Sequence, residues 1–429
     1  MRNLSRRELL AGGSAVVAAS CTTSRPIVTG PAVAPAPASQ AQAAALLDSI
    51  AENLLWLDPE QATTLGIDNG RRAALRSQLE DRSAAGQARI AATLRADLAR
   101  AESIDTSALD FATRTSVEVV KSAYRNSLEG FAMPYGDVAV GSWRNTPYVV
   151  IQNVGAYLDT PRFLDSDHVI KGVSDAEAYL ARLEWMGRQL DGETGRIVDA
   201  RGKGLVPPAF LLDKAIGQME AVLKGARGGG PMVESLARRS KDIPGDWSGR
   251  ARAVVGQKIV PALERQLAEL KAERAVATMD PGLWARPGGD AFYAWALKAS
   301  TTTTMSPDEI HRMGLEQLAE LHGQMDPILK KLGYSQGPVG ARMNALAKDK
   351  RYQFSEGDKG RAEILAYIEE WLGRFRGLMP RAFNTLVRGN LEVKRLPPEE
   401  EPGAPGAYGG AGSIDGTIPG KFWINLRTT

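Results

Sequence analysis

Apolar side chains recur every three or four residues along much of the chain from Ala43 onward. This spacing gathers them on one side of an α-helix, so it predicts a series of amphipathic helices. We interpret the stripes, including their aromatic and methionine members, as core. The stripes comprise Leu46, Leu47, Ile50, Leu54 and Leu57; Val117, Val120, Tyr124 and Leu128; Ile310, Met313, Leu318, Leu321, Met325 and Leu329; and Ile364, Leu365, Ile368, Leu372 and Phe375.

Three places carry signals for the start of a helix. Asp58 followed by Pro59 is typical of an N-cap and a first helical turn. The segment 174–177 (SDAE) has the spacing of a capping box before an apolar stripe. The segment 306–309 (SPDE) is the clearest, because its serine caps, its proline takes the first helical position and its glutamate returns a bond. Gly333 is a suitable stop for the helix that follows.

The pattern changes near the C-terminus. Residues 391–396 (LEVKRL) are short and alternating, as in a strand, and residues 397–412 are dense in Pro and Gly, as in a loop. Residues 421–426 (KFWINL) alternate again and predict a half-buried strand. The predicted fold class is therefore mainly α: a large helical domain with a short C-terminal strand element.

The first 42 residues form two segments with separate roles. Residues 1–21 resemble a twin-arginine signal, with Arg6 and Arg7 before an apolar stretch of about 11 residues that is too short to span a bilayer. Cys21 stands where a lipoprotein signal places its lipidated cysteine, and cleavage after a nearby alanine is the alternative. Residues 22–42, rich in Pro and Ala, read as a tether before a domain over 43–429. We expect an exported protein, periplasmic or lipid-anchored at the cell envelope, whose only membrane contact is that anchor.

Composition excludes several kinds of site. The 429 residues carry a net charge of only +3 and show no basic stripe, which argues against a nucleic-acid partner. Cys21 is the single cysteine, so neither an internal disulfide nor a cluster of thiolate ligands can form.

The three histidines give no metal motif. His311 and His322 share one helical face, but eleven residues separate them by about 16 Å, too far for one metal ion. His168 lies near Asp165 and Asp167 in sequence, but nothing supplies the remaining ligands. The sequence contains neither Gly-x-Ser-x-Gly nor His-Glu-x-x-His. From the residues alone we predict no catalytic residue, no metal site and no cofactor in this chain.

The order of several segments resembles the bacterial family called domain of unknown function 885. The similarity runs from about Leu46 to the last residue. It is carried by 57–66 (LDPEQATTLG), 147–152 (PYVVIQ) with 155–159 (GAYLD), 206–208 (VPP) with 212–216 (LDKAI), and most strongly 415–425 (DGTIPGKFWIN).

The resemblance implies an exported or lipid-anchored helical protein similar to zinc peptidases, with a gluzincin-like helical cleft. Family members carry their zinc-binding helix, with a His-Glu motif, after the strand that ends this sequence. The cleft of this chain is thus expected to be C-terminally incomplete, with zinc bound only in a full-length relative. The complete protein is expected to hydrolyse peptide or amide bonds in small peptide-like substrates, and this chain alone to be inactive.

The resemblance also implies a substrate-binding role for the last strand. An extended substrate can pair with an exposed strand, and residues 422–426, with Phe422, Trp423 and Asn425, are the candidate. Asp415 and Gly420 would shape the preceding turn, and Tyr408 could donate a hydrogen bond to a developing oxyanion. The other interpretation is a structural turn and a core strand. The rival function is a non-catalytic helical binding or scaffold protein tethered to the envelope.

Overall fold

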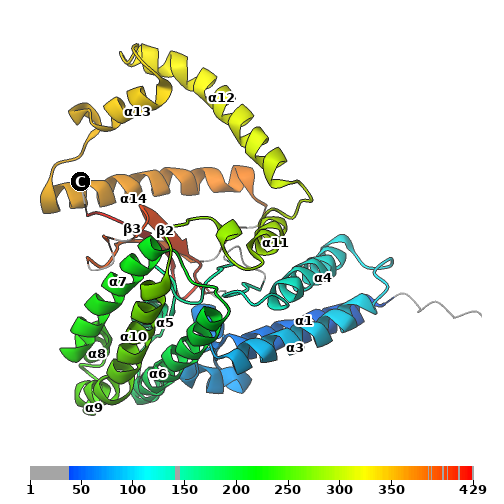
Figure 1. Cartoon of the computed structure of the whole chain (residues 1–429). Coiled ribbons are helices and arrows are strands. Elements are labelled where there is room, and N and C mark those ends of the chain that lie inside the picture. The colour runs from blue at the N-terminus through cyan, green and yellow to red at the C-terminus, as the bar shows by residue number, and fades with distance from the viewer. Residues whose placement is uncertain are drawn as a thin grey trace, which may run out of the picture.

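The computed structural model describes residues 38–140, 145–384, 386–387, 389–398, 401–402, 404–413 and 416–427. It confirms a mainly helical fold with a small sheet near the C-terminus (Figure 1). The predictions for the signal, for lipidation at Cys21 and for most of the tether fall outside the described residues, as do those for Arg6, Arg7 and Asp415. The first helix begins at Gln40, slightly before the predicted domain start at residue 43.

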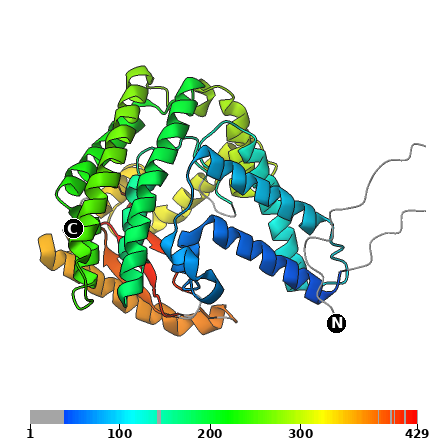
Figure 2. The same ribbon diagram turned by 90° about the horizontal axis from the view of Figure 1, so that it is seen from below.

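The first helices form a unit that extends from the main body (Figure 2). A hydrophobic cluster joins the first, third and fourth of them, and it contains the predicted stripe residues Leu46, Ile50 and Tyr124 in buried positions. Its helices are α1 (Gln40–Leu57), α3 (Ala84–Glu102) and α4 (Phe111–Phe131). Between α1 and α3, α2 (Pro59–Thr64) is followed by a 3₁₀ segment (Gly70–Ser77) that packs on the main body.

The main body holds the largest core cluster. Its elements are α5 (Ala156–Ser166), α6 (Val173–Gly202), α7 (Ala209–Arg227), α8 (Gly230–Arg239), α9 (Trp247–Val254), a π-helical turn (Val255–Ile259) and α10 (Val260–Val276). Helices α6, α7 and α10 pack side by side, with α5 against α6 and α8 (Figure 1).

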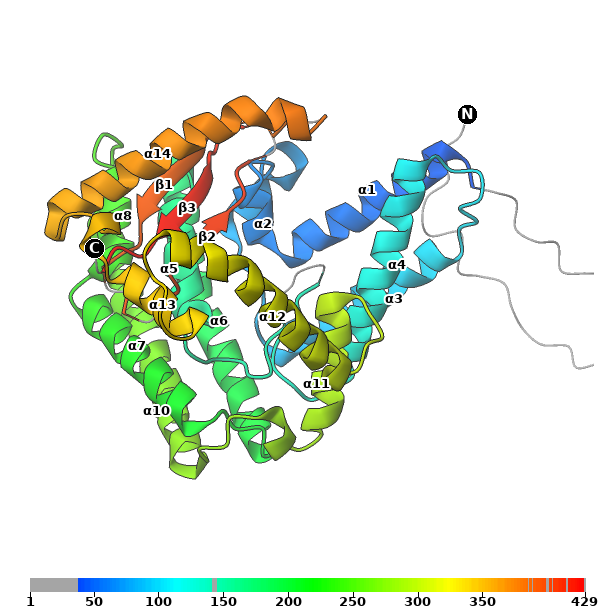
Figure 3. The ribbon, with the colours of Figure 1, turned by 90° about the horizontal axis from the view of Figure 1, so that it is seen from above.

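The later helices lie outside this body. They are a 3₁₀ turn (Leu283–Ala285), α11 (Gly289–Thr301), α12 (Pro307–Lys331), α13 (Val339–Ala347), a 3₁₀ turn (Lys350–Tyr352) and α14 (Gly357–Ala382). Helix α11 packs on α4, whereas α12 packs mainly on α13, and the two form an arm (Figures 1 and 3).

The sheet has three strands, β1 (Leu391–Arg395), β2 (Ala407–Gly410) and β3 (Gly420–Ile424), in the order β1-β3-β2. Strand β3 pairs parallel with β1 and antiparallel with β2. Helices α14 and α5 lie on opposite sides of it (Figure 1). The two predicted strands are confirmed. Strand β2 lies within residues 397–412, which we predicted as a loop; its two glycines hide the strand pattern from the sequence.

Helix caps agree with the sequence at two of the three predicted starts. Asp58 accepts a hydrogen bond from the backbone of Gln61, and Ser306 forms the predicted capping box. The chain leaves α12 with Gly333 at a φ of 95°, as a glycine stop requires. The third predicted start is displaced, because α6 begins at Val173 and not after Ser174. The carboxylate of Asp175 caps this earlier start by accepting hydrogen bonds from the backbone nitrogens of Lys171 and Gly172.

The predicted core stripes of α12 and α14 are largely wrong. On α12 only Leu329 is buried, and on α14 the only buried residue is Gly360. Leu318, Leu321 and Phe375 are exposed, and the other stripe members are half-buried. The periodicity identified the helices correctly, but in the described structure the sheet and α13 cover these faces only in part.

Candidate functional site

The predicted substrate-binding strand is not an edge strand. Backbone pairing occupies β3 on both sides, from Gly420 to Ile424 along β1 and from Lys421 to Ile424 along β2. An extended substrate therefore cannot pair with β3, which corrects the expectation for 422–426. The edges of the described sheet are β1 and β2.

Lys421 joins the sheet to the helical body. Its side chain is 5% exposed, and its Nζ donates to the backbone oxygen of Ser166 and lies 3.5 Å from Oδ1 of Asp167. Burial lowers the pKa of Lys421 and raises the pKa of Asp167, and the attraction between the two charges opposes each shift. This pair fixes β3 against the end of α5.

The aromatic rings of Tyr408 and Trp423 lie side by side on the face of the sheet toward α5. They are direct partners across β2 and β3, and their ring centroids lie 6.0 Å apart. The guanidinium of Arg162, on α5, lies 5.2 Å from the centre of the Tyr408 ring. Nζ of Lys421 lies 5.8 Å from the centre of the Trp423 ring. The structure thus brings two predicted residues together with two cations, at distances typical of cation–π contacts.

The remaining predicted residues are separate from this group. The side-chain amide of Asn425 donates to the backbone oxygens of Glu401 and Ala404, so it holds the loop before β2. The backbone of Gly420 donates to Asn390, where β1 and β3 begin to pair. Phe422 lies between Lys421 and Trp423 on β3, so its side chain is on the face of the sheet opposite to α5. For Asn425 and Gly420 the structural interpretation therefore accounts for the contacts.

The N-terminal half of α5 lies at an acidic cluster. We define this cluster as Asp58, Glu60, Glu80, Asp159 and Glu193 around Arg82. The guanidinium of Arg82 lies 3.0 Å from Glu193, 3.3 Å from Asp159 and 3.9 Å from Glu80. Burial alone would lower the pKa of Arg82, but the carboxylates outweigh burial and raise it.

Two carboxyl groups of the acidic cluster titrate near neutral pH. Burial, with the nearby charge of Asp58, raises the pKa of Glu60 to about 7. Burial also raises the pKa of Glu80 to about 8, although Arg82 opposes the shift. Oε2 of Glu60 accepts a hydrogen bond from the backbone nitrogen of Glu80 at 2.8 Å. A carboxyl group with such a pKa can both give and take a proton near neutral pH, as general acid–base chemistry requires.

The sequence analysis did not identify the acidic cluster. Its members lie on four separate segments between residues 58 and 193, so no local motif joins them. Residues 57–66 contain the one available signal, because Asp58 and Glu60 stand in a segment that carries the family resemblance. We interpreted Asp58 only as a helix cap, which it also is.

Another buried carboxyl group lies on α10. Glu273 is 2% exposed and forms no ion pair within the described ranges, where its Oε2 also has no hydrogen-bond partner. Burial, with Glu269, raises its pKa to about 8, and Arg201 opposes the shift. A carboxyl group in this position is protonated at neutral pH.

His168 has a structural role. Its Nδ1 accepts a hydrogen bond from the guanidinium of Arg182 at 2.8 Å, and its Nε2 lies 2.9 Å from the backbone oxygen of Asp175. These partners fix the tautomer with the proton on Nε2. Burial and the charge of Arg182 lower the pKa of His168 to about 3. Because both nitrogens are engaged, His168 is not available as a metal ligand.

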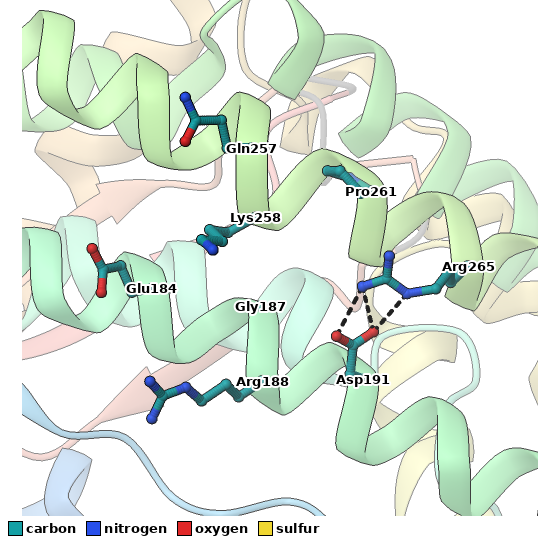
Figure 4. A pocket seen from close by; sticks show the side chains of 8 residues that line it. All are labelled: Glu184, Gly187, Arg188, Asp191, Gln257, Lys258, Pro261 and Arg265. Carbon is teal, nitrogen blue, oxygen red and sulfur yellow. Dashed lines mark hydrogen bonds and ion pairs between the residues drawn. The ribbon is translucent and has the colours of Figure 1, made fainter.

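Two pockets lie on the helical body, and neither contains a predicted site residue. One pocket, of about 410 Å³, lies between α6 and the segment formed by the π-helical turn and α10, and most of its lining side chains are charged (Figure 4). Asp191 and Arg265 form an ion pair across it at 2.7 Å. The other, of about 280 Å³, lies between α3, α6 and the segments 130–138 and 147–149.

Over the described ranges, no three His, Cys, Asp or Glu side chains are arranged to hold a metal ion. The described residues therefore do not form a site for the zinc ion that the resemblance implies in a full-length relative, and no chemical step is derived through it. None of the helices in the same ranges has the length and apolar character needed to cross a membrane.

The comparisons with known proteins decide the family. A profile of the family described as "Bacterial protein of unknown function (DUF885)" matches residues 59–429. The chain belongs to this family. No curated protein sequence matches the chain.

Among the solved structures that resemble this DUF885 chain, two are putative lipoproteins by their descriptions. One is described as a "putative lipoprotein" from Colwellia psychrerythraea; it has 26% sequence identity and a TM-score of 0.83, and the match covers 90% of this chain and 67% of that one. The other, from Shewanella oneidensis, is titled a "putative lipoprotein of unknown function" and shares the fold at 15% identity and a TM-score of 0.54, over 91% of this chain and 64% of that one. The chain thus spans about two thirds of the length of each.

Proposed function

We propose that this chain is the N-terminal helical part of an exported hydrolase that cleaves peptide or amide bonds. The zinc ligands and the general base of that hydrolase would be residues outside the described ranges. The observation that carries the proposal is that β2 is an edge strand of the described sheet and carries Tyr408. The ring of Tyr408 lies next to the ring of Trp423 and the guanidinium of Arg162.

Strand β2 replaces β3 as the proposed substrate strand. The backbone nitrogen of Asn425 donates to the oxygen of Gly406 at 2.8 Å, so Gly406 directs its backbone groups toward β3. In an antiparallel pair every second residue does the same. Residues 408 and 410 then pair with β3, while Ala407 and Gly409 direct their backbone groups away from it. Gly409 is exposed and has no side chain, so an extended peptide could approach this edge closely.

The acidic cluster supports the proposal from the other end of α5. Helix α5 spans both sites: Asp159 contacts Arg82, Arg162 contacts Tyr408, and the helix ends at Ser166, which contacts Lys421. Glu60 and Glu80, whose pKa values are raised toward neutral pH, would be ionisable groups in addition to the general base outside the described ranges. A peptide paired with β2 would lie on a sheet whose position α5 fixes relative to these groups.

We also propose export to the envelope and lipid anchoring at Cys21. The twin-arginine pattern and the Pro-rich tether support export. Two structural neighbours described as putative lipoproteins support anchoring. Metabolic labelling with a fatty acid, in the wild type and in Cys21→Ser, tests the anchor: label in the wild type alone is expected, and equal label would contradict it.

The hydrolase proposal is tested on the protein isolated from its own cells. Metal analysis and a screen of short peptides should find zinc and chelator-sensitive cleavage, while residues 22–429 alone should be inactive. Absence of both zinc and cleavage in the native protein would leave the envelope-tethered binding protein as the function. Cleavage by residues 22–429 alone would contradict the assignment of the catalytic groups to other residues.

A pair of variants tests β2. Gly409→Pro removes one outward backbone donor, so KM for peptides should rise while kcat changes little. Gly409→Ala keeps that donor and adds a methyl group 3.2 Å from the oxygen of Lys421, so it is the matched control. Equal KM values for the two variants would remove β2 from the substrate site.

A further inference from the structure

Helix α14 exposes a second apolar face besides the one on the sheet. Tyr367, Trp371, Phe375 and Leu378 are spaced by four, four and three residues, so they share one side of the helix. Tyr367 is 49% exposed and Phe375 55% exposed. The three rings follow one another at centroid distances of 6.2 and 6.0 Å, which makes a continuous aromatic row.

Helix α12 repeats this arrangement on the arm. Leu315, Leu318, Leu321 and Ile328 share one side of the helix, and Ile328 is 60% exposed. Helices α12 and α14 are 25 and 26 residues long, yet each buries a single residue in the described structure. The 30-residue α6, in contrast, buries side chains on almost every turn.

Exposed rows of this kind mark a surface that another element covers. A surface helix normally turns its apolar stripe toward the elements that it packs against, and leaves its polar side in water. Single exposed apolar residues are ordinary, whereas contiguous rows mark interaction surfaces.

We infer that the exposed faces of α12 and α14 are the packing sites of a further helical segment of the same polypeptide. The two solved structures that resemble this chain supply the argument for this occupant. They match 90% and 91% of this chain, but only 67% and 64% of their own length lies in the match. Each therefore has about a third of its chain outside the match. In the described structure the two apolar faces are covered only in part, with the Phe354 ring 5.6 Å from that of Tyr367. The segment would present its own apolar stripe to both faces.

This inference concerns packing, so it requires neither zinc nor hydrolysis. It rests on the part of the proposed function that places this chain within a longer protein. Loss of the hydrolase assignment would leave it intact, because its test measures access to side chains and not cleavage.

The test compares thiol labelling in the protein isolated from its own cells with labelling in a chain that stops at residue 429. In a Cys21→Ser background, Trp371→Cys and Leu318→Cys report on the two apolar faces. Glu369→Cys and Glu316→Cys are the controls, because they are exposed residues of the same helices outside these faces. In the native protein a maleimide should label the apolar positions more slowly than the controls by about tenfold or more. In the short chain all four positions should react at similar rates.

Three results would overturn the inference. The first is a native mass equal to that of the present sequence after removal of its signal. The second is fast labelling of Trp371→Cys and Leu318→Cys in a longer native protein. The third is protection that disappears on dilution, which would assign the faces to a second copy of the chain.

Discussion

Nζ of Lys421 lies 3.5 Å from Oδ1 of Asp167, although 254 residues separate the two in sequence. Lys421 is on the central strand of the sheet, and Asp167 directly follows α5. The pair, with the bond from the same Nζ to Ser166, attaches the C-terminal sheet to the helical body. This attachment sets the distance between the aromatic pair of the sheet and the acidic cluster.

Removal of this cation should destabilise the protein. Lys421→Met leaves the carboxylate of Asp167 and the backbone oxygen of Ser166 buried without their partner, which we expect to lower the free energy of unfolding by about 3 kcal/mol. Lys359→Met, on α14, removes an exposed pair with Glu363 and should cost less than about 0.5 kcal/mol. Urea unfolding measures both, and equal losses would show that the buried pair has no special role.

Glu273 should make stability depend on pH. Its folded-state pKa of about 8 lies above the ordinary value of 4.5, so the folded protein holds this proton more tightly than the unfolded chain. Between these values the group therefore lowers stability as pH rises, by up to about 1.4 kcal/mol per pH unit.

Glu273→Gln removes this dependence. The variant should match the wild type near about pH 5 and exceed its unfolding free energy near about pH 9. Chemical denaturation at both pH values is the measurement. A variant that is less stable by the same amount at both would mean that the carboxyl group is not protonated in the fold.

His168 should stay neutral well into the acid range. Because its folded pKa is about 3, below the ordinary 6.5, protonation occurs first in the unfolded chain. This group contributes to a loss of stability as pH falls through that window. The ring nitrogen shifts in an NMR titration should keep the Nε2-protonated form down to about pH 4. A midpoint near neutral pH for this ring would contradict the buried contact with Arg182.

Two glycines of α6 should respond oppositely to alanine. A methyl group on Gly192 would lie 2.9 Å from the backbone nitrogen of Ser83, so Gly192→Ala should lower the unfolding free energy by about 1–3 kcal/mol. Gly195 has no atom within 4 Å of that position, so Gly195→Ala should raise it by about 0.5–1 kcal/mol. Thermal unfolding of both variants is the measurement. A stable Gly192→Ala protein would show that α6 and residue 83 are less closely packed.

Local signals predicted the fold well where one segment determines its own structure. The cap at Ser306 and the stop at Gly333 place α12 within a few residues, because caps act through bonds to the nearest backbone groups. The same periodicity could not tell which faces of α12 would be covered, since burial depends on elements distant in sequence.

The candidate site was predicted less completely, for a related reason. Tyr408 and Trp423 were identified and do lie together, but their relation depends on β2, which glycines conceal. The acidic cluster was missed because Arg82 gathers carboxylates that are up to 111 residues away from it. Charge pairs across such separations leave no spacing pattern in a sequence.

The strand order β1-β3-β2 determines when the sheet can form during synthesis. Strands β1 and β2 leave the ribosome first, yet neither pairs with the other in the finished protein. Both must wait for residues 420–424, whose backbone supplies the partners for each. The described sheet therefore cannot form before residues 420–424 have been synthesised, because β3 supplies the pairing partner of both outer strands. The bond from Lys421 to Ser166 likewise needs β3, so the last of the three strands to be synthesised attaches the sheet to a helix that ends 255 residues earlier in the chain.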